Sequence, residues 1–227
     1  MKVLVLSTPE MAVEFKAKFS QPFFGQAPLF ITSYNDMAIC VEGVDIVFDF
    51  LLAGNREKLV FYTTTQKLVV FCHAVTIQLA ELLRNYTGSC TFIGFNGMPS
   101  LFNRPVLEVT LLHKNDAAVL KNVCQKLLTP FILTEDRVGM ATPRILCMII
   151  NEAFYSLQEK IASEQDVDLA MKLGTNYPAG PFEWGSRIGL ENVYQVLQAV
   201  YSDTKDERYK ICPLLKTMVL KKTSVAM

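Results

Sequence analysis

Two histidines are the side chains in this chain that could exchange a proton near neutral pH. His73 comes just after an apolar run that predicts a buried strand, near the strand end where active sites of α/β proteins gather. His113 ends a later strand pattern at a predicted loop. We interpret both as ordinary packed or surface histidines, with His73 as the candidate substitute for a general base. No other ligand stands at a useful spacing, so no metal site is predicted.

The six cysteines are scattered along the chain with no close pair, and several lie inside apolar runs. Such cysteines are typical of buried, reduced thiols rather than disulfides or metal ligands.

The elements that would position these groups change in character near Asp136. Before it, short apolar runs predict buried strands, with helical stretches at residues 10–19 and 76–84 between some of them. The predicted strands are residues 3–6, 29–32, 46–50, 67–72, 90–95, 106–112 and 131–133, with a further helix at 117–128 before the last. This alternation predicts an α/β, Rossmann-like, doubly wound parallel sheet of the nucleotide-binding type in residues 1–135.

Residues 136–227 read as an all-α domain. Residues 145–150 are apolar nearly all round, which predicts a helix buried from several sides, and Phe154, Leu157 and Ile161 continue a narrower stripe. Ser163 is a candidate N-cap, and Gly174 suits the C′ position of the same short helix. Pro181 fits the first turn of the next helix, and residues 190–200 predict another amphipathic helix.

The bulk composition excludes several classes of partner. Lys plus Arg total 22 and Asp plus Glu total 22, so no net charge attracts nucleic acid or an anionic membrane surface. With 51% hydrophobic residues the chain can bury a core without disulfides or metal. No apolar run is long enough for a signal peptide core or a membrane span, so we expect a cytoplasmic protein.

The helical part carries the most specific motif. Residues 166–174 read DVDLAMKLG, residues 177–183 read YPAGPFE, and Gly189-Leu190 follow. In order and spacing these segments resemble the C-terminal domain of the 3-hydroxyacyl-CoA dehydrogenases. Upstream, FIGF at 92–95, LEV at 107–109 and DRVG at 136–139 are similar to the family's strands around its catalytic residues and to its crossing into the helical domain.

The resemblance implies a specific chemistry. In such dehydrogenases NAD binds at the edge of the sheet, a histidine takes the 3-hydroxyl proton as hydride leaves, and a glutamate orients that histidine. Serine and asparagine side chains bind the substrate. The helical domain closes over the acyl-CoA and forms a homodimer contact, which places such proteins in fatty acid metabolism.

This sequence departs from the family at the residues that perform the reaction. Asn96 stands at the histidine position, and its amide cannot accept a proton near neutral pH. Glu108 matches the family's glutamate but is expected to have lost its partner. Pro143 replaces the substrate-binding asparagine, and in the serine-bearing stretch at 72–76 Thr76 is the residue with a hydroxyl. By resemblance, Asn96, Glu108, Thr76 and His73 are the candidate catalytic positions.

The cofactor loop departs as far. Where G-x-G-x-x-G should follow the first strand, residues 7–12 read STPEMA, so Ser7, Thr8 and Met11 are the cofactor-binding candidates by position alone. Pro9 removes a donor and Glu10 places an anion where phosphate would lie. Helix capping is the interpretation we favour for this segment. Tyr34 follows the second strand, where a carboxylate would read the ribose, and Asp36 is a weak substitute.

Three functions remain open from the sequence. The first is a dehydrogenase-like pseudoenzyme that retains acyl-CoA or nucleotide binding. The second is an active NAD(P)-dependent oxidoreductase of a 3-hydroxyacyl-CoA or related hydroxy acid, with His73 or Glu108 as base. The third is a dimeric interaction module without a ligand. A homodimer formed through the helical domain is expected in all three cases.

Overall fold

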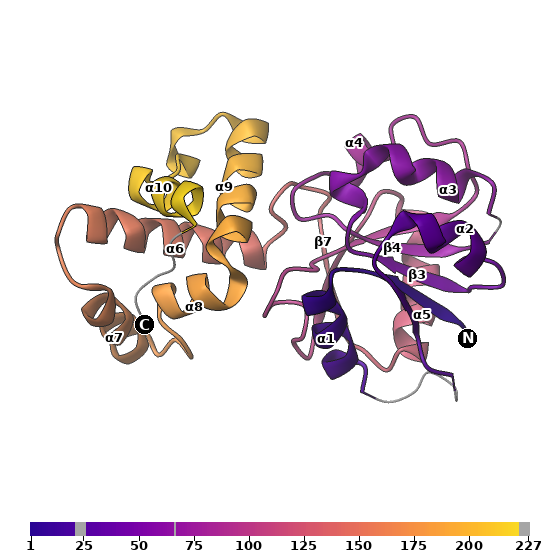
Figure 1. Cartoon of the computed structure of the whole chain (residues 1–227), viewed down its shortest axis with the longest axis horizontal. Coiled ribbons are helices and arrows are strands. Elements are labelled where there is room, and N and C mark those ends of the chain that lie inside the picture. Colours follow the sequence, from indigo (N-terminus) through magenta and orange to yellow (C-terminus); the bar gives the residue numbers. More distant parts are fainter. Residues whose placement is uncertain (21–25, 66, 223–227) are drawn as a thin grey trace. The chain divides into compact units, whose positions relative to one another are not determined.

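The computed structural model describes residues 1–20, 26–65 and 67–222. The chain forms two compact units, Met1–Met140 and Ala141–Met227, each described below by itself (Figure 1). The domain boundary predicted from the sequence, at residues 135/136, lies a few residues before the point where the two units divide.

Unit 1 is built on a seven-stranded sheet with the strand order β2-β1-β3-β4-β5-β6-β7. Six pairings along this order are described, and all are parallel except that of β5 with β6. Each predicted strand is confirmed to within two residues at its ends. The strands are β1 (Val3–Leu6), β2 (Leu29–Ile31), β3 (Ile46–Asp49), β4 (Val69–His73), β5 (Thr91–Phe95), β6 (Leu107–Leu111) and β7 (Phe131–Thr134).

The central strands are buried on both faces, which explains why their sequences are continuous apolar runs instead of alternating ones. All four residues of β1 and of β3 are buried. Successive side chains point to opposite faces, so Val3 and Val5 belong to one core cluster while Leu4 and Leu6 belong to the other.

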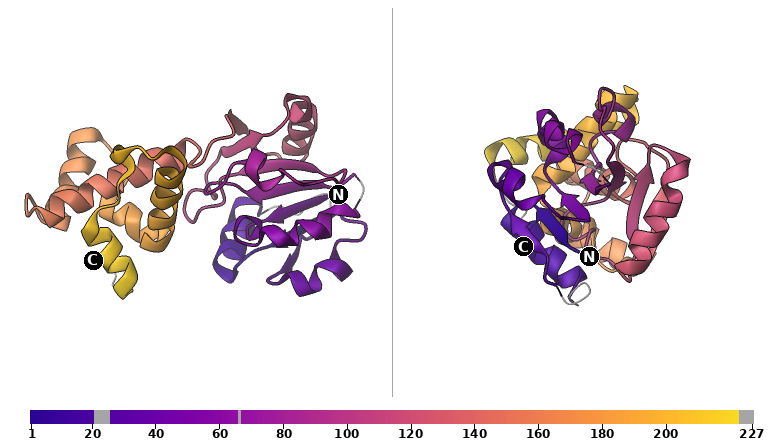
Figure 2. Two further views of the ribbon diagram at one scale, coloured as in Figure 1. Left: turned by 90° about the horizontal axis from the view of Figure 1, so that it is seen from above. Right: turned by 90° about the vertical axis from the view of Figure 1, so that its right-hand side faces the viewer.

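Helices cover both faces of this sheet, as Figures 1 and 2 show. One face packs against α1 (Pro9–Lys18) and α5 (Ala117–Lys126). The other packs against the short helices α2 (Met37–Cys40), α3 (Val60–Thr63) and α4 (Leu79–Leu82). The doubly wound arrangement predicted from the sequence is therefore confirmed.

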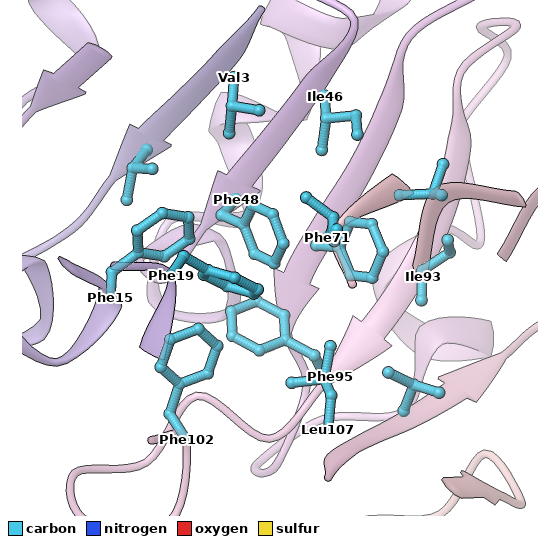
Figure 3. Close-up of a cluster of buried hydrophobic side chains, with 14 of the residues drawn as sticks. Val3, Phe15, Phe19, Ile46, Phe48, Phe71, Ile93, Phe95, Phe102 and Leu107 are labelled. Atoms are coloured by element: carbon cyan, nitrogen blue, oxygen red, sulfur yellow. The ribbon is translucent and has the colours of Figure 1, made fainter. Parts of the chain in front are cut away.

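The core on the α1 side is rich in phenylalanine (Figure 3). Phe48 stacks on Phe71 with ring centroids 4.6 Å apart, and Phe50 meets Phe95 edge to face at 4.9 Å. Phe102, from the loop between β5 and β6, is fully buried and packs on Phe15 of α1. This loop is also tied to α1 by a hydrogen bond of 2.6 Å from the Ser100 amide to Glu14.

The predicted helix at 76–84 is mostly wrong, because α4 covers Leu79–Leu82 alone. Its start is fixed by a residue distant in the sequence. Asp136 accepts hydrogen bonds from the amides of Leu79 at 2.7 Å and Ala80 at 2.9 Å. Residues 76–78 therefore lie before the helix, in the loop that follows β4.

Unit 2 is helical, as predicted, and α6 contacts the helices α7 to α10 (Figure 1). Its helices are α6 (Thr142–Gln158), α7 (Glu164–Thr175), α8 (Pro181–Ile188), α9 (Leu190–Thr204) and α10 (Pro213–Lys221). The prediction that residues 145–150 are buried all round is wrong for Ile145, which is 63% exposed. Ile161 is 70% exposed and lies beyond the end of α6, so it does not continue the apolar stripe.

Capping residues define α7 and α8. Ser163 caps α7 by accepting from the amide of Asp166 at 3.2 Å, as predicted. The predicted end at Gly174 is wrong, since α7 runs to Thr175 and Asn176 takes the left-handed conformation. Pro181 opens α8, as predicted.

All six cysteines are free, and Cys72, Cys124, Cys147 and Cys212 are buried. Among the described residues, no helix is long and apolar enough to cross a membrane.

Candidate functional site

Four polar residues lie at the edge of the sheet in unit 1 where the parallel strands β3, β4 and β5 end. Asp49 and His73 end β3 and β4, and Asn96 directly follows β5. Because β6 runs antiparallel to β5, Glu108 near its start lies at the same edge. The carboxyl ends of parallel strands are where ligands bind in open α/β sheets, so this edge is the candidate site.

Asn96 and Glu108 form a buried pair. The side-chain amide nitrogen of Asn96 donates to Glu108 Oε2 at 3.2 Å, and the Asn96 backbone amide donates to the Glu108 carbonyl oxygen at 3.0 Å. The two residues are 3% and 5% exposed. The expectation that Glu108 has lost its partner is therefore wrong, because the residue that replaces histidine still contacts the carboxylate.

The orientation of the Asn96 amide is fixed by a second contact. Its Oδ1 accepts a hydrogen bond from the Met98 backbone amide at 3.2 Å. Since a backbone N–H can only donate, the oxygen faces Met98 and the nitrogen faces Glu108. Asn96 thus supplies a donor to the carboxylate and has no basic atom with which to remove a proton.

His73 lies on the neighbouring strand end as a neutral donor. Its Nδ1 accepts the Gly97 backbone N–H at 2.9 Å, so in the neutral ring the proton is on Nε2. Burial lowers the pKa of His73 to about 4. A Cβ on Gly97 would lie 2.9 Å from Nδ1, which explains the glycine there. The lone pair that a general base needs is already used by Gly97.

Thr76 is partly buried and lies in the loop between β4 and α4, near the same edge of the sheet. Its neighbour Val75 accepts a hydrogen bond from the Gly139 amide at 2.6 Å, which holds this loop to the last residues of unit 1. His113, by contrast, is exposed at the far end of β6 and takes no part in the site.

The segment after β1 is a helix cap, as the sequence favoured. Thr8 is the N-cap of α1 and accepts from the Met11 amide at 3.4 Å, with Pro9 in the first turn. The Ser7 amide donates to the Ile31 carbonyl at 3.1 Å. Met11 is 6% exposed and belongs to the core.

Glu10 places a negative charge in the first turn of α1. Hydrogen bonds to its carboxylate, first from its own backbone amide and then from the Thr8 side chain, lower the pKa of Glu10. A phosphate at this terminus would meet that carboxylate and find the Ser7 amide engaged. The residues present at 7–12 do not fit a dinucleotide pyrophosphate.

A buried network that the sequence analysis missed occupies the end of β3. Asp49, fully buried, accepts hydrogen bonds of 2.8 Å from both the Tyr34 and Tyr62 hydroxyls and one of 2.9 Å from the Leu51 amide. Burial raises the pKa of Asp49, and these hydrogen bonds oppose the rise. The available signal was one acidic residue inside the apolar run at 46–50.

This network also fixes the orientation of Tyr34, which follows β2 by three residues. Tyr34 is 7% exposed and turned toward Asp49, whereas Asp36 is exposed. Tyr34 therefore offers no carboxylate for a ribose near the end of β2.

In unit 2, Pro143 lies in the first turn of α6, where the resemblance leads one to expect an asparagine. The arginine that follows it is engaged within the same unit, because Arg144 donates to the Tyr209 hydroxyl at 2.8 Å. No cluster of possible metal ligands occurs among the described residues.

Comparison with known proteins agrees with the motif in the helical unit. Residues 139–224 match the profile of the 3-hydroxyacyl-CoA dehydrogenase C-terminal domain. The chain is 41% identical over 187 residues to 3-hydroxybutyryl-CoA dehydrogenase of Clostridioides difficile, covering 81% of this chain and 66% of that protein. Over 85 residues it is 45% identical to 3-hydroxyadipyl-CoA dehydrogenase of Escherichia coli, covering 37% of this chain and 18% of that protein.

Two solved structures share the fold of the whole chain at low identity. Mycobacterium tuberculosis FadB2 superposes with a TM-score of 0.76 at 16% identity, covering 97% of this chain and 94% of that one. The (S)-3-hydroxybutyryl-CoA dehydrogenase PaaH1 of Ralstonia eutropha superposes with a TM-score of 0.71 at 19% identity, and it covers the same shares of the two chains. The curated relatives are longer, since the chain covers at most 66% of the first four.

Proposed function

Because the chain belongs to the 3-hydroxyacyl-CoA dehydrogenase family, we propose that it binds an acyl-CoA thioester at the carboxyl edge of its sheet and that its hydride transfer is impaired. The relatives that carry the name 3-hydroxybutyryl-CoA dehydrogenase suggest the ligand class. The single observation behind the impairment is Asn96, whose oxygen is bound by the Met98 amide and whose nitrogen is bound to Glu108.

Loss of the base has a large effect on rate. A positioned acid–base group contributes roughly 10²–10⁴-fold to an enzymatic reaction. In this chain Glu108 is held by an amide that cannot receive the hydroxyl proton, and His73 presents an N–H donor. The residues are therefore suited to bind and orient a carbonyl-bearing ligand more than to remove a proton from a hydroxyl.

The dinucleotide is the part of the family's chemistry that this chain fits least. NAD would supply the hydride acceptor in such an enzyme. Residues 7–12 contain no glycine, and Glu10 brings an anion to the start of α1. The Tyr34 hydroxyl is hydrogen-bonded to Asp49. We therefore propose that this chain does not bind NAD.

Calorimetric titration of the whole chain with acetoacetyl-CoA, NAD and NADH separates these possibilities. We expect saturable heat with acetoacetyl-CoA and none with either nucleotide. Comparable binding of NADH would contradict the assignment of residues 7–12 as a cap. No heat with acetoacetyl-CoA would overturn the proposed ligand and favour a protein that binds no small molecule.

A further inference from the structure

We propose that Asp136 is a positioning residue of the thioester site at the carboxyl edge of the sheet. It holds the loop between β4 and α4 in place, and the loop in turn fixes the Thr76 hydroxyl for a hydrogen bond to the bound acyl-CoA. This inference rests on the acyl-CoA binding proposed above and adds to it a residue that is distant from the site in the sequence.

Asp136 binds the loop through both its side chain and its main chain. Its carboxylate oxygens accept hydrogen bonds from the amides of Leu79 at 2.7 Å and Ala80 at 2.9 Å, and its carbonyl oxygen accepts one from the Gln78 side chain at 2.7 Å. Each carboxylate oxygen has its own amide donor, so an asparagine at this position could satisfy only one of the two. The three hydrogen bonds attach Asp136 to the end of the loop.

These bonds fix the position of the loop more than they stabilise a helix. The helix that follows the loop, α4, is four residues long. Helices this short have little stability of their own in water, because the first turn fixes several residues for a single hydrogen bond. The carboxylate of Asp136 therefore matters chiefly for where the loop and the start of α4 lie.

The same loop is attached at two further points. The Ala74 amide donates to the Phe95 carbonyl oxygen of β5 at 3.1 Å, and the Gly139 amide donates to the Val75 carbonyl oxygen at 2.6 Å. Gly139 has a φ of 89°, a conformation that glycine adopts without the steric cost that a side chain brings. The loop is therefore held by β5 at its start and by residues 136–139 further along.

Thr76 is the polar side chain that this arrangement presents. Val75 and Ile77 on either side of it are 0% and 1% exposed, whereas Thr76 is partly exposed. Its hydroxyl is the one side-chain hydrogen-bonding group in residues 74–77, and a hydroxyl can donate to a carbonyl oxygen of a thioester. Because the loop is bound on both sides of Thr76, a loss of the bonds to Asp136 displaces this hydroxyl.

A double-mutant cycle measured by calorimetry with acetoacetyl-CoA tests this inference. Thr76→Val removes the hydroxyl at nearly constant volume and should weaken binding roughly tenfold. Asp136→Asn should weaken binding by a similar factor, since it leaves one of two backbone amides without an acceptor. In the Thr76→Val background, Asp136→Asn should have no further effect, because the group that it positions is already gone.

Hydrogen exchange followed by NMR separates a local change from a loss of the fold. In Asp136→Asn the amides of Leu79 and Ala80 should exchange faster, while the amides of β4 keep their protection. Asp116→Asn, at the start of α5, is the matched control for the affinity. The Asp116 side chain makes no capping hydrogen bond within that described helix, so this variant should bind acetoacetyl-CoA as the unchanged protein does.

The possible outcomes distinguish this inference from the function on which it rests. Equal affinity of Asp136→Asn and the unchanged protein would overturn it, and so would unchanged affinity in Thr76→Val. An equal loss from Asp136→Asn in both backgrounds would show a merely structural role, and loss of protection in β4 would show a defect of the whole fold. Either result would overturn the inference as well. Absence of binding to the unchanged protein would instead overturn the proposed function.

Discussion

At the scale of single residues, Asn96 decides what the site can do. Its side-chain nitrogen donates to Glu108 and its oxygen accepts from Met98, so the residue has contacts on both sides but no basic atom. The sequence alone predicts that residue 96 cannot act as a base, because basicity follows from residue type. It does not predict the surviving contact, because that depends on the register of β5 against β6.

His73 makes a prediction about acid stability. Burial lowers its folded-state pKa to about 4 from 6.5, so as pH falls the unfolded chain takes up the proton first. The contribution of His73 to stability is therefore complete above pH 6.5 and is lost as pH falls toward 4, by about 3 kcal/mol at most.

Chemical denaturation at several pH values measures this effect. His73→Asn keeps an acceptor for the Gly97 amide and removes the titrating ring, so its stability should fall less between pH 7 and pH 4 than that of the unchanged protein. His113→Asn, at an exposed histidine, is the control. An equal acid loss in His73→Asn and the unchanged protein would refute the assignment.

At the scale of elements, apolar runs predict all seven strands. The central strands such as β1 and β3 are buried on both faces and tolerate few polar residues, whereas β2 and β7 at the two ends of the strand order are apolar but partly exposed. The features that the sequence did not predict depend on contacts between distant segments. The start of α4 depends on Asp136, which is 57 residues away from Leu79 in the sequence. The Tyr34–Asp49–Tyr62 network joins three separate segments, and no local sequence pattern predicts such contacts.

A second prediction concerns the start of α8. Asp168 of α7 is 8% exposed and accepts hydrogen bonds from the Phe182 amide at 2.8 Å and the Glu183 amide at 3.0 Å. Asp168→Asn leaves one acceptor and turns an NH₂ group toward the other amide. The variant should lose about 1–3 kcal/mol of unfolding free energy.

Thermal or denaturant unfolding checks this loss. Asp203→Asn, an exposed aspartate in α9, should change stability by about 0.5 kcal/mol or less. If Asp168→Asn unfolded at the same temperature or denaturant concentration as Asp203→Asn, the hydrogen bonds from Asp168 to the start of α8 would not be stabilising the protein.

At the scale of the whole molecule, we expect a homodimer formed through the helical unit. Leu169 and Leu173 lie one turn apart on α7 and are 52% and 78% exposed, which leaves apolar surface for a partner. Leu173→Lys should shift the protein toward monomer in sedimentation velocity runs. Leu128→Lys, at an apolar residue of unit 1 that is 86% exposed, should not. A concentration-independent monomer before any substitution would rule out the dimer.

We expect a site whose Asn96 has no basic atom to bind a 3-ketoacyl thioester without efficient redox turnover. NADH absorbance can be followed over time with saturating acetoacetyl-CoA, for the unchanged protein and for His73→Ala. We expect no protein-dependent loss of absorbance in either. Rapid NADH oxidation that disappears in His73→Ala would contradict it, because His73 would then be supplying the missing acid–base group.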